Sequence, residues 1–370
     1  MTLVRAWRAG VFSMSELCAH FGVSRKTGYK WVGRYLEDGV EGLRDQSRAP
    51  QRCPHRTREE VAEAIVAVRR AHPRWGPKKI VEVLARVQPE LARPAVSTAG
   101  AILQRAGLVR GRRRRSRWAH PGRPAVRASR PNEVWTVDFK GQFRLRDASL
   151  CYPLTVQDQW SRYVLACRGM ASPQLCEVRA AMERLFRTVG LPEAIRTDNG
   201  EPFASRGLRG LTRLNVWWMR LGIRHERIQR GHPEQNGAHE RMHRDLKAET
   251  TRPPGASLAC QQRRFERFRA SYNRERPHEG IGQRLPASLW TPAPRPYPRW
   301  LSDPDYPGHL EVRRVRTSGE IKFQGRLLFL SEPLVGELVG LEPIDDGIWS
   351  IVFTTTLLAR FDERTRRIVG

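Results

Sequence analysis

The stretch Glu133-Val-Trp-Thr-Val-Asp-Phe-Lys140 is an apolar, β-prone run that ends close to an acidic side chain, Asp138. A second short apolar run, Ala194 to Thr197, is followed directly by Asp198. Both runs are typical of buried strands. Open α/β sheets gather functional side chains where their strands end. We therefore predict an α/β fold in which the two aspartates lie at one edge of a sheet.

Strand and helix signals alternate through residues 131 to 255. Besides the two runs above, the expected elements are strands over Cys151 to Val156, Tyr163 to Cys167 and Ile223 to His225, and helices from Ser172 to Val189, through Trp217 and Trp218, and after Pro233. A meander of three strands followed by alternating elements suits a ribonuclease-H-like α/β fold. We expect the tryptophan pair in its core rather than stacked on nucleic-acid bases.

The polar helix after Pro233 contributes a third acid, Glu240, within Asn236-Gly-Ala-His-Glu-Arg-Met-His243. Alone, an acid at a strand end or in an Asp-Asn-Gly turn is usually structural. Carboxylates about 4 Å apart repel by roughly 4 kcal/mol at an effective dielectric of about 20, so a cluster of them needs a cation. Oxygen ligands suit Mg²⁺ or Mn²⁺, and two such ions would support in-line displacement at a phosphodiester. The expected ligands are Asp138, Asp198 and Glu240.

The chain carries an excess of positive charge, with 66 Lys and Arg against 38 Asp and Glu and a net charge of +28. Such a field attracts a polyanion, so double-stranded DNA is the expected partner, although a merely solvated basic surface has the same composition. Without an apolar run of about eighteen residues or a signal-peptide pattern, we expect a soluble cytoplasmic protein of the bacterial nucleoid and no membrane partner. Six cysteines without a C-x-x-C pair indicate neither a disulfide framework nor a zinc finger.

Residues 1–50 have the pattern of a helix-turn-helix DNA-binding domain. A short helix is followed by a turn at Gly22 and by a second helix with Ser24 as its cap. The apolar side of the pair is expected to comprise Leu17, Phe21, Val23, Trp31, Val32 and Tyr35. The residues expected to meet base edges are Arg25, Lys26, Thr27 and Lys30. A plain helical hairpin is the alternative.

Residues 51–110 are expected to form a second helical DNA-binding domain. Its helices are predicted after the capping-box pattern of Thr57 and Glu60, from Trp75 onward, and from Ser97 to Ala106. A basic linker over 111–130 follows, and it includes Arg112, Arg113, Arg114 and Arg115. These arginines repel one another but can lie along phosphates and displace counterions. In a eukaryote the same run could serve as a nuclear-localisation signal.

Residues 305–370 hold short β-prone runs separated by turn residues such as Asp345-Asp-Gly347. The runs are Glu320 to Phe323, Leu327 to Leu330, Leu338 to Leu341, Ile348 to Phe353 and Thr356 to Phe361. We expect a small C-terminal β-barrel. Its arginines could contact DNA, or it could be a structural cap.

The three acid motifs, with His232-Pro-Glu-Gln-Asn-Gly-Ala-His-Glu-Arg-Met-His243, resemble the integrase core of insertion-sequence transposases related to retroviral integrases. Tyr272-Asn-Arg-Glu-Arg-Pro-His278 and Leu285-Pro-Ala287 resemble the segment that follows this core, and the N-terminal helix-turn-helix also matches. The resemblance implies a DDE-type transposase with its catalytic core and trailing helix over 131–290. It would bind element ends, cleave to expose 3′-hydroxyls and join them to target DNA. Because two ends must be held at once, at least a homodimer is expected.

The third acid departs from the spacing that is common in that family, which would select Glu234. We choose Glu240, six residues further on, because it lies within the helix, whereas Glu234 precedes the irregular start at Asn236-Gly237. The catalytic and metal-binding residues implied by the resemblance are then Asp138, Asp198 and Glu240.

Spacings of three, four and seven from Glu240 put His243, Arg244 and Lys247 near the same face of the helix. The side chains of Arg244 and Lys247 could hold DNA beside the metals, or they could be ordinary surface charges. His239 and His243 are expected to be polar neighbours of the site rather than ligands.

Two other functions fit the same residues. A ribonuclease-H-like nuclease would cut DNA without joining it and would not need two helix-turn-helix modules. A DNA-binding regulator could carry an inactive relic of the core, although the presence of all three acids argues against decay. An assay of metal-dependent cleavage separates these possibilities.

Overall fold

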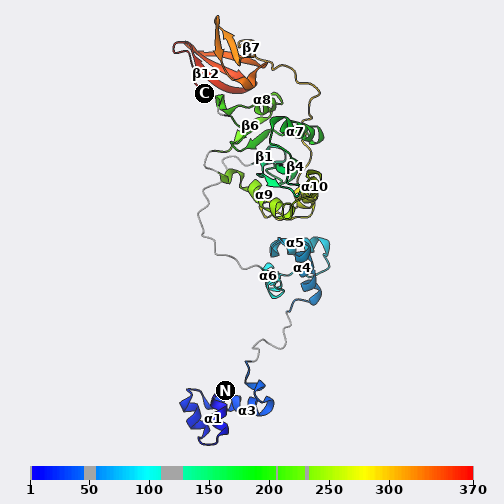
Figure 1. Cartoon of the computed structure of the whole chain (residues 1–370), viewed down its shortest axis with the longest axis vertical. Coiled ribbons are helices and arrows are strands. Elements are labelled where there is room, and N and C mark those ends of the chain that lie inside the picture. Colours follow the sequence, from blue (N-terminus) through cyan, green and yellow to red (C-terminus); the bar gives the residue numbers. More distant parts are fainter. Residues whose placement is uncertain (1, 46–55, 110–127, 206, 230–232, 370) are drawn as a thin grey trace. The chain divides into compact units, whose positions relative to one another are not determined.

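The computed structural model describes residues 2–45, 56–109, 128–205, 207–229 and 233–369. Figure 1 shows the order of its elements along the chain. The chain divides into two compact units, Met1–Arg58 and Glu59–Gly370. The arginine run Arg112 to Arg115 and Cys53 lie outside the described residues. The other five cysteines are free, and no helix in the described ranges is long and apolar enough to cross a membrane.

In its described residues, the first unit has three helices and a short 3₁₀ turn. These are α1 (Thr2–Arg8), α2 (Met14–His20), α3 (Arg25–Asp38) and η1 (Glu41–Leu43). Ser13 begins α2 through a capping box with Glu16, and the Ser24 hydroxyl begins α3 by accepting the backbone N–H of Thr27. Between them Gly22 takes a positive φ of 63°, which glycine adopts without strain. The predicted helix-turn-helix is confirmed.

The two helices of this motif pack closely because α3 carries a glycine at their contact. A Cβ added to Gly28 would lie 2.5 Å from Cys18 Sγ and 2.9 Å from Met14 Sδ. Leu17 and Val32 are buried in the same unit, as the apolar pattern predicts. Any larger residue at position 28 would therefore separate α2 from α3.

The second unit begins with another three-helix bundle, α4 (Glu59–Ala71), α5 (Pro77–Val87) and α6 (Val96–Arg105). Ile65, Ile80 and Leu103, one from each helix, are fully buried in its core. Pro77 is the first residue of α5, where its missing N–H costs nothing. The third helix starts one residue earlier than predicted, with Ala95 rather than a side-chain cap before it.

A six-stranded sheet forms the centre of the second unit. Its strands are β1 (Val134–Phe139), β2 (Phe143–Arg144), β3 (Leu150–Asp158), β4 (Val164–Met170), β5 (Ala194–Thr197) and β6 (Arg224–Arg227). β3 pairs antiparallel with β1, β2 and β4, whereas β5 is parallel to β1 and β6 is parallel to β5. An antiparallel meander followed by parallel strands is the predicted ribonuclease-H-like arrangement, and only the short β2 was missed.

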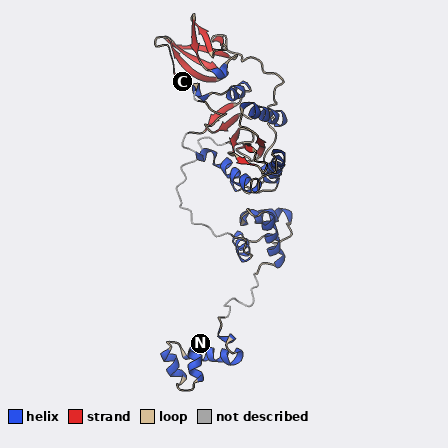
Figure 2. Cartoon of the chain, in the orientation of Figure 1, coloured by secondary structure: helices blue, strands red, loops and turns tan. Residues whose placement is uncertain are grey.

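Helices pack on the strands of the central sheet (Figure 2), and they do so through two separate apolar clusters. The helices are α7 (Leu175–Val189), α8 (Arg213–Arg220), α9 (Gly237–Thr250) and α10 (Leu258–Arg274), with η2 (Leu208–Gly210) before α8 and η3 (Pro233–Asn236) before α9. Leu165 of β4 belongs to the cluster of α7 and α8, and its neighbour Val164 to the cluster of α9 and α10. Successive strand residues point to opposite faces, so the two pairs of helices lie on opposite faces. Trp217 and Trp218 are buried in the first cluster, as predicted.

The C-terminal strands form open sheets, so the predicted closed barrel is not confirmed. An antiparallel sheet has the order β13 (Arg367–Val369), β12 (Thr356–Asp362), β11 (Ile348–Phe353), β10 (Leu338–Asp345) and β7 (Glu311–Arg314), and β8 (Glu320–Phe323) pairs only with β9 (Arg326–Phe329). Leu211, which directly follows η2, and Val216 and Met219 of α8 pack into the apolar core of these strands. The sheet therefore buries its apolar face partly against the central fold, and closure on itself is not required.

Candidate active site

The register of two parallel strands brings Asp138 and Asp198 to one edge of the sheet. In the pairing of β1 with β5, Thr136 lies opposite Arg196. Two residues further along each chain come Asp138 and Asp198, so the two aspartates leave the sheet at the same level. Neighbouring strands are about 4.8 Å apart. The backbone alone thus places these carboxylates side by side.

The charges of both other predicted acids, Asp198 and Glu240, affect the pKa of the Asp138 carboxyl group. Burial raises its pKa, repulsion by Asp198 and Glu240 raises it further, and a hydrogen bond from the Phe139 backbone and the charge of Lys140 oppose the rise. The resulting pKa is about 7. The Asp138 side chain is 17% exposed, whereas Glu240 is exposed in the first turn of α9. The structure therefore brings all three acids into one electrostatic neighbourhood.

The turn after β5 holds the carboxylate of Asp198. Gly200 donates its backbone N–H to Asp198 Oδ1 at 3.1 Å, and the Asn199 side chain donates to the Ile228 carbonyl at 2.9 Å. A Cβ added to Gly200 would lie only 3.2 Å from Asp198 Oδ2. The Asp-Asn-Gly sequence thus makes a turn and also leaves one side of the carboxylate open.

Buried histidines attach α9 to the sheet directly behind Asp138. The two ring nitrogens of His239 lie 2.6 Å from the hydroxyls of Thr136 and Thr155, and His243 Nε2 lies 2.7 Å from the Thr155 hydroxyl. That hydroxyl also donates to the Asp138 carbonyl at 3.0 Å. Burial lowers the pKa of His239 to about 3 and that of His243 to about 2, so both rings are neutral.

Asp138, His239 and His243 are close enough together to be considered as a metal site. The hydrogen bonds of His239 occupy both of its nitrogens, and His243 Nδ1 is 3.7 Å from Asp138 Oδ2. A metal ligand needs a free nitrogen lone pair, so a histidine held on both sides by hydroxyls is a support for the helix. This geometry favours the predicted role of His239 as a polar neighbour, whereas His243 is held by a hydroxyl at Nε2 and turns its Nδ1 toward Asp138.

The exposed side of α9 differs in one respect from the sequence prediction. Glu240, Arg244 and Lys247 are all exposed, as expected for residues on one face. His243, predicted near that face, is instead buried against Thr155 and Asp138. An imidazole can pack against the sheet once its polar atoms are paired, and that pairing overrides the simple face assignment. The Glu234 side chain lies outside the described part of the chain.

Asn236 is a site residue that the sequence pattern indicates only as the start of the helix. Its side chain is buried, with Nδ2 3.5 Å from Asp138 Oδ2 and with no partner for Oδ1 in the described part of the chain. A buried amide with one free polar atom beside a carboxylate is positioned to contact a ligand or water. The signal available in the sequence was its place four residues before Glu240, one helical turn away.

The predicted base-contacting residues of α3 divide into two groups. Arg25, Lys26 and Lys30 are exposed, whereas Thr27 is half-buried and its hydroxyl lies 2.9 Å from that of Ser24. The hydroxyl of Thr27 is therefore already used in the helix cap. Arg112 to Arg115, the other predicted contacts, lie outside the described residues.

Family matches cover the chain in a consistent order. A Helix-turn-helix domain matches residues 2–51 and a Homeodomain-like domain matches 27–103. The Integrase core domain matches 128–233 and, in a second form, 221–286. The C-terminal domain of the IS481 family transposases matches 310–369. The three acids, the two buried histidines and Asn236 thus fall within the integrase core matches, and the predicted base-contacting residues of α3 fall within the helix-turn-helix match.

Individual relatives come from bacterial insertion elements and from retroviruses. The Insertion element IS476 uncharacterized 39.2 kDa protein of Xanthomonas euvesicatoria is 27% identical over 62% of this chain. The Insertion element IS407 uncharacterized 31.7 kDa protein of Burkholderia multivorans is 26% identical over 64% of this chain and 82% of its own length. The Gag-Pol polyprotein of Baboon endogenous virus is 30% identical over 36% of this chain.

The alignments leave parts of these relatives uncovered. The match spans 64% of the IS476 protein and 7% of the viral polyprotein. Among solved structures, the HTLV-2 integrase catalytic core domain in complex with magnesium aligns with 44% of this chain at 17% identity and a TM-score of 0.34. That score is too low to support an argument, so the fold assignment depends on the strand order of this chain.

Proposed function

We propose that this chain, which has the domain composition of an insertion-sequence transposase, is a DNA transposase of the DDE type. It would bind the ends of its element, cleave phosphodiester bonds to expose 3′-hydroxyls and join these to target DNA. The observation that carries the proposal is the strand register that brings Asp138 and Asp198 to one edge of the sheet, where burial and the charges of Asp198 and Glu240 raise the pKa of Asp138. Such repulsion between carboxylates is unfavourable in a protein unless a cation is bound there.

The donor set fits a divalent cation of the Mg²⁺ or Mn²⁺ type, because it consists of carboxylates from separate elements with room for water and phosphate oxygens. The residues that would hold two such ions are Asp138, Asp198 and Glu240. Bound there, the ions would neutralise phosphate charge, activate the attacking oxygen and stabilise the negative charge on the leaving oxygen. Asn236 keeps the Asp138 carboxylate oriented, and Gly200 does the same for Asp198.

Positively charged side chains would hold the DNA. The exposed start of α3 would read base edges with Arg25 and Lys26, while Lys30 contacts the backbone. Thr27 would instead support the N-terminal cap of α3, where its hydroxyl contacts that of Ser24. The basic linker and the exposed cations of α9 would neutralise phosphates near the scissile bond, through Arg112, Arg113, Arg114, Arg115, Arg244 and Lys247. Because joining requires two element ends together, the active form would be at least a homodimer.

The test is strand transfer by the full chain on labelled duplexes that carry the terminal sequences of its element. In Mg²⁺ or Mn²⁺ the labelled strand should become joined to a plasmid target, and Asp198→Asn should abolish joining. Asp147→Asn is the matched control, since Asp147 is an exposed aspartate in the turn between β2 and β3. Full joining by Asp198→Asn would contradict the proposal.

Two other results would select the alternatives. Metal-dependent cutting without any joined product would indicate a ribonuclease-H-like nuclease. Tight binding to the element ends without metal-dependent cleavage would indicate a DNA-binding regulator. Either result would replace the transposase assignment.

A further inference from the structure

The motif Tyr272-Asn-Arg-Glu-Arg-Pro-His278 lies at the end of α10, and its first residues attach that helix to the sheet. Asn273 Oδ1 accepts the backbone N–H of Val164 at 2.8 Å, and its Nδ2 donates to the Val164 carbonyl at 2.9 Å. Tyr272 is buried, with its hydroxyl 3.4 Å from Gln157 Nε2. These contacts fix the C-terminal end of α10 against β3 and β4. They do not explain the arginine that follows.

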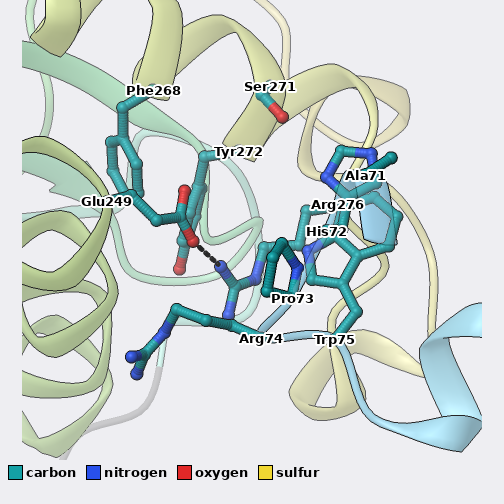
Figure 3. Close-up of a pocket in the computed structure, with 10 residues that line it drawn as sticks. All are labelled: Ala71, His72, Pro73, Arg74, Trp75, Glu249, Phe268, Ser271, Tyr272 and Arg276. Atoms are coloured by element: carbon teal, nitrogen blue, oxygen red, sulfur yellow. Dashed lines mark hydrogen bonds and ion pairs between the residues drawn. The ribbon is translucent and has the colours of Figure 1, made fainter. Parts of the chain in front are cut away.

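Arg276 extends from the turn after α10 to α9, the helix that carries Glu240. Its guanidinium lies 2.5 Å from Asp245 Oδ2 and 3.4 Å from Glu249 Oε1. Figure 3 shows the Arg276 guanidinium joined to the Glu249 carboxylate, with the side chains of Tyr272 and Arg74 beside this pair. The Arg276 side chain is only 8% exposed and Asp245 14%, so their ion pair is largely shielded from water, whereas Glu249 is more exposed.

The two carboxylates lie on the part of α9 that faces away from Glu240. With about 100° per residue, Asp245 is turned about 140° and Glu249 about 180° from Glu240 around the helix axis. At about 1.5 Å per residue they are also about 7 Å and about 13 Å further along it. A contact at this distance on the opposite side controls the rotation of the helix about its own axis.

We propose that Arg276 is a positioning residue for Glu240. It holds the C-terminal half of α9 in one rotational setting, while the hydrogen bonds of His239 and His243 with Thr155 hold the N-terminal half. With both halves fixed, Glu240 is directed toward Asp138 and Asp198. This inference depends on the proposed function, since it assigns Arg276 a role in the geometry of that carboxylate site.

The chemistry of the contact favours arginine. A planar guanidinium presents separate N–H groups to two carboxylates in a fixed geometry, whereas lysine offers a compact point charge on a flexible chain. Removing the buried Arg276 cation leaves Asp245 with only its longer, more exposed contact to Arg74 and takes away the ion pair of Glu249, so the helix would be expected to shift. A cavity of about 130 Å³ beside the guanidinium, also lined by His72 and Trp75, leaves room for a methionine side chain in its place.

A neighbouring contact strengthens the same helix. Arg74, from the segment between α4 and α5, has its guanidinium 3.5 Å from Asp245 Oδ1. Lys79 Nζ donates to the Pro277 carbonyl at 2.7 Å, immediately after Arg276. Arg74 is about two-fifths exposed, so its ion pair is weaker than the shielded pair made by Arg276. Arg276 is therefore the residue to test.

The experiment compares Arg276→Met with Arg276→Lys and with the control Arg274→Met. Arg274 is exposed on the last turn of α10, so its substitution removes the same charge from the same helix end. For each full-length variant, Mn²⁺ affinity without DNA is measured by electron paramagnetic resonance. Turnover in strand transfer at saturating DNA and Kd for the element-end duplex are measured alongside.

Arg276→Met should bind Mn²⁺ about tenfold more weakly and turn over about tenfold more slowly, the effect typical of residues that orient metal ligands. Its Kd for DNA should stay within about twofold of wild type. Arg276→Lys should recover part of the Mn²⁺ affinity, and Arg274→Met should match wild type. A merely structural role would lower stability without selectively changing Mn²⁺ affinity.

A folded Arg276→Met that binds Mn²⁺ and turns over like wild type would overturn the inference. Should that variant fail to fold, Arg276→Lys and Asp245→Asn decide in its place, and wild-type Mn²⁺ affinity in both overturns it equally. If the wild-type chain itself neither binds Mn²⁺ nor joins strands, the proposed function is wrong. If the wild-type chain binds Mn²⁺ and joins strands, and the Arg276 variants do both equally well, then the positioning role is wrong and the proposed function is not contradicted.

Discussion

Asp138, near the end of β1, and Asp198, directly after β5, lie at the same level of two parallel, neighbouring strands. The pairing of Thr136 with Arg196 fixes this arrangement, because each aspartate comes two residues after a member of that pair. Their proximity is thus a property of the backbone register and does not depend on flexible side chains. The resulting repulsion, together with burial, raises the pKa of Asp138 to about 7.

The metal-free protein should lose stability as the pH rises from about 4 to about 7. In this window the folded chain keeps a proton on Asp138 that the unfolded chain, in which an aspartate has its ordinary pKa of 3.8, has released. Folding is therefore favoured at low pH, and this contribution is lost as the pH passes the folded pKa. At pH 8 the cost is on the order of 2 to 4 kcal/mol. Asp138→Asn should remove it.

Urea unfolding in EDTA between pH 5 and pH 8 measures the effect. The readout is the difference in free energy of unfolding between wild type and Asp138→Asn, because the contributions of the other carboxyl groups are the same in both proteins and cancel. Mg²⁺ should raise the midpoint of wild type at pH 8 and should have little effect on Asp138→Asn. An unchanged difference across the pH range would show that Asp138 is not perturbed.

Gly200→Ala should impair joining without unfolding the protein. Its new Cβ would lie 3.2 Å from Asp198 Oδ2, so the carboxylate must shift by a few tenths of an ångström. Misplacement of a reacting group on the scale of 1 Å can cost about a hundredfold in rate, so about a tenfold loss is expected here. Strand transfer at saturating DNA measures it.

Gly308→Ala is the matched control, since a Cβ there meets nothing within 4 Å. Both variants should show thermal midpoints close to that of wild type. If Gly200→Ala joins strands at the wild-type rate, the open side of Asp198 has no role in the reaction.

The elements that position Asp138 and Asp198 could be predicted because their signals are local. The strands Val134–Phe139 and Ala194–Thr197 coincide with the predicted runs, since each is a short apolar segment bounded by polar residues. The attachment of α9 could not be predicted in this way. Thr155 contacts a histidine 84 residues away, and no periodicity in the sequence indicates such a partner.

In the C-terminal region the individual strands were largely predictable from the sequence, but their arrangement into open sheets was not. Five of the seven strands in this region were predicted from apolar runs, whereas β7 and β13 were missed because arginines occupy much of their length. Whether a set of strands closes depends on what else covers its apolar face. Here Leu211, Val216 and Met219 contribute to that cover from a distant part of the sequence.

Thr155→Val should destabilise the second unit, because one hydroxyl serves both buried histidines. Valine has nearly the same shape but leaves the Nε2 atoms of His239 and His243 without that partner. Unsatisfied buried polar groups cost about 1 to 3 kcal/mol each, so a loss of about 2 to 4 kcal/mol is expected. Thr155→Ser keeps the hydroxyl and should lose less than about 1 kcal/mol, because only a methyl group is removed. Urea unfolding with equal m-values would measure the difference, and equal stability of the two variants would contradict the proposed support.

Arg25→Ala should relax DNA sequence specificity, because Arg25 is exposed at the first position of α3. A side chain that reads a base edge contributes about 1 to 3 kcal/mol of discrimination, so the preference for a selected site over random duplex should fall by about tenfold or more. Thr27→Val, in contrast, should cost helix stability, since the Thr27 hydroxyl is hydrogen-bonded to that of Ser24.

Fluorescence anisotropy on a duplex selected from a random pool, and on an unselected duplex, separates these effects. Arg5→Ala is the control, because Arg5 is an exposed arginine on α1 of the same unit. A base-reading role lowers affinity for the selected duplex much more than for the unselected one. A phosphate contact weakens both equally and reduces the slope of log Kd against log salt by about one. Equal weakening by Arg25→Ala would therefore assign Arg25 to the DNA backbone, and the source of specificity would then lie elsewhere in the chain.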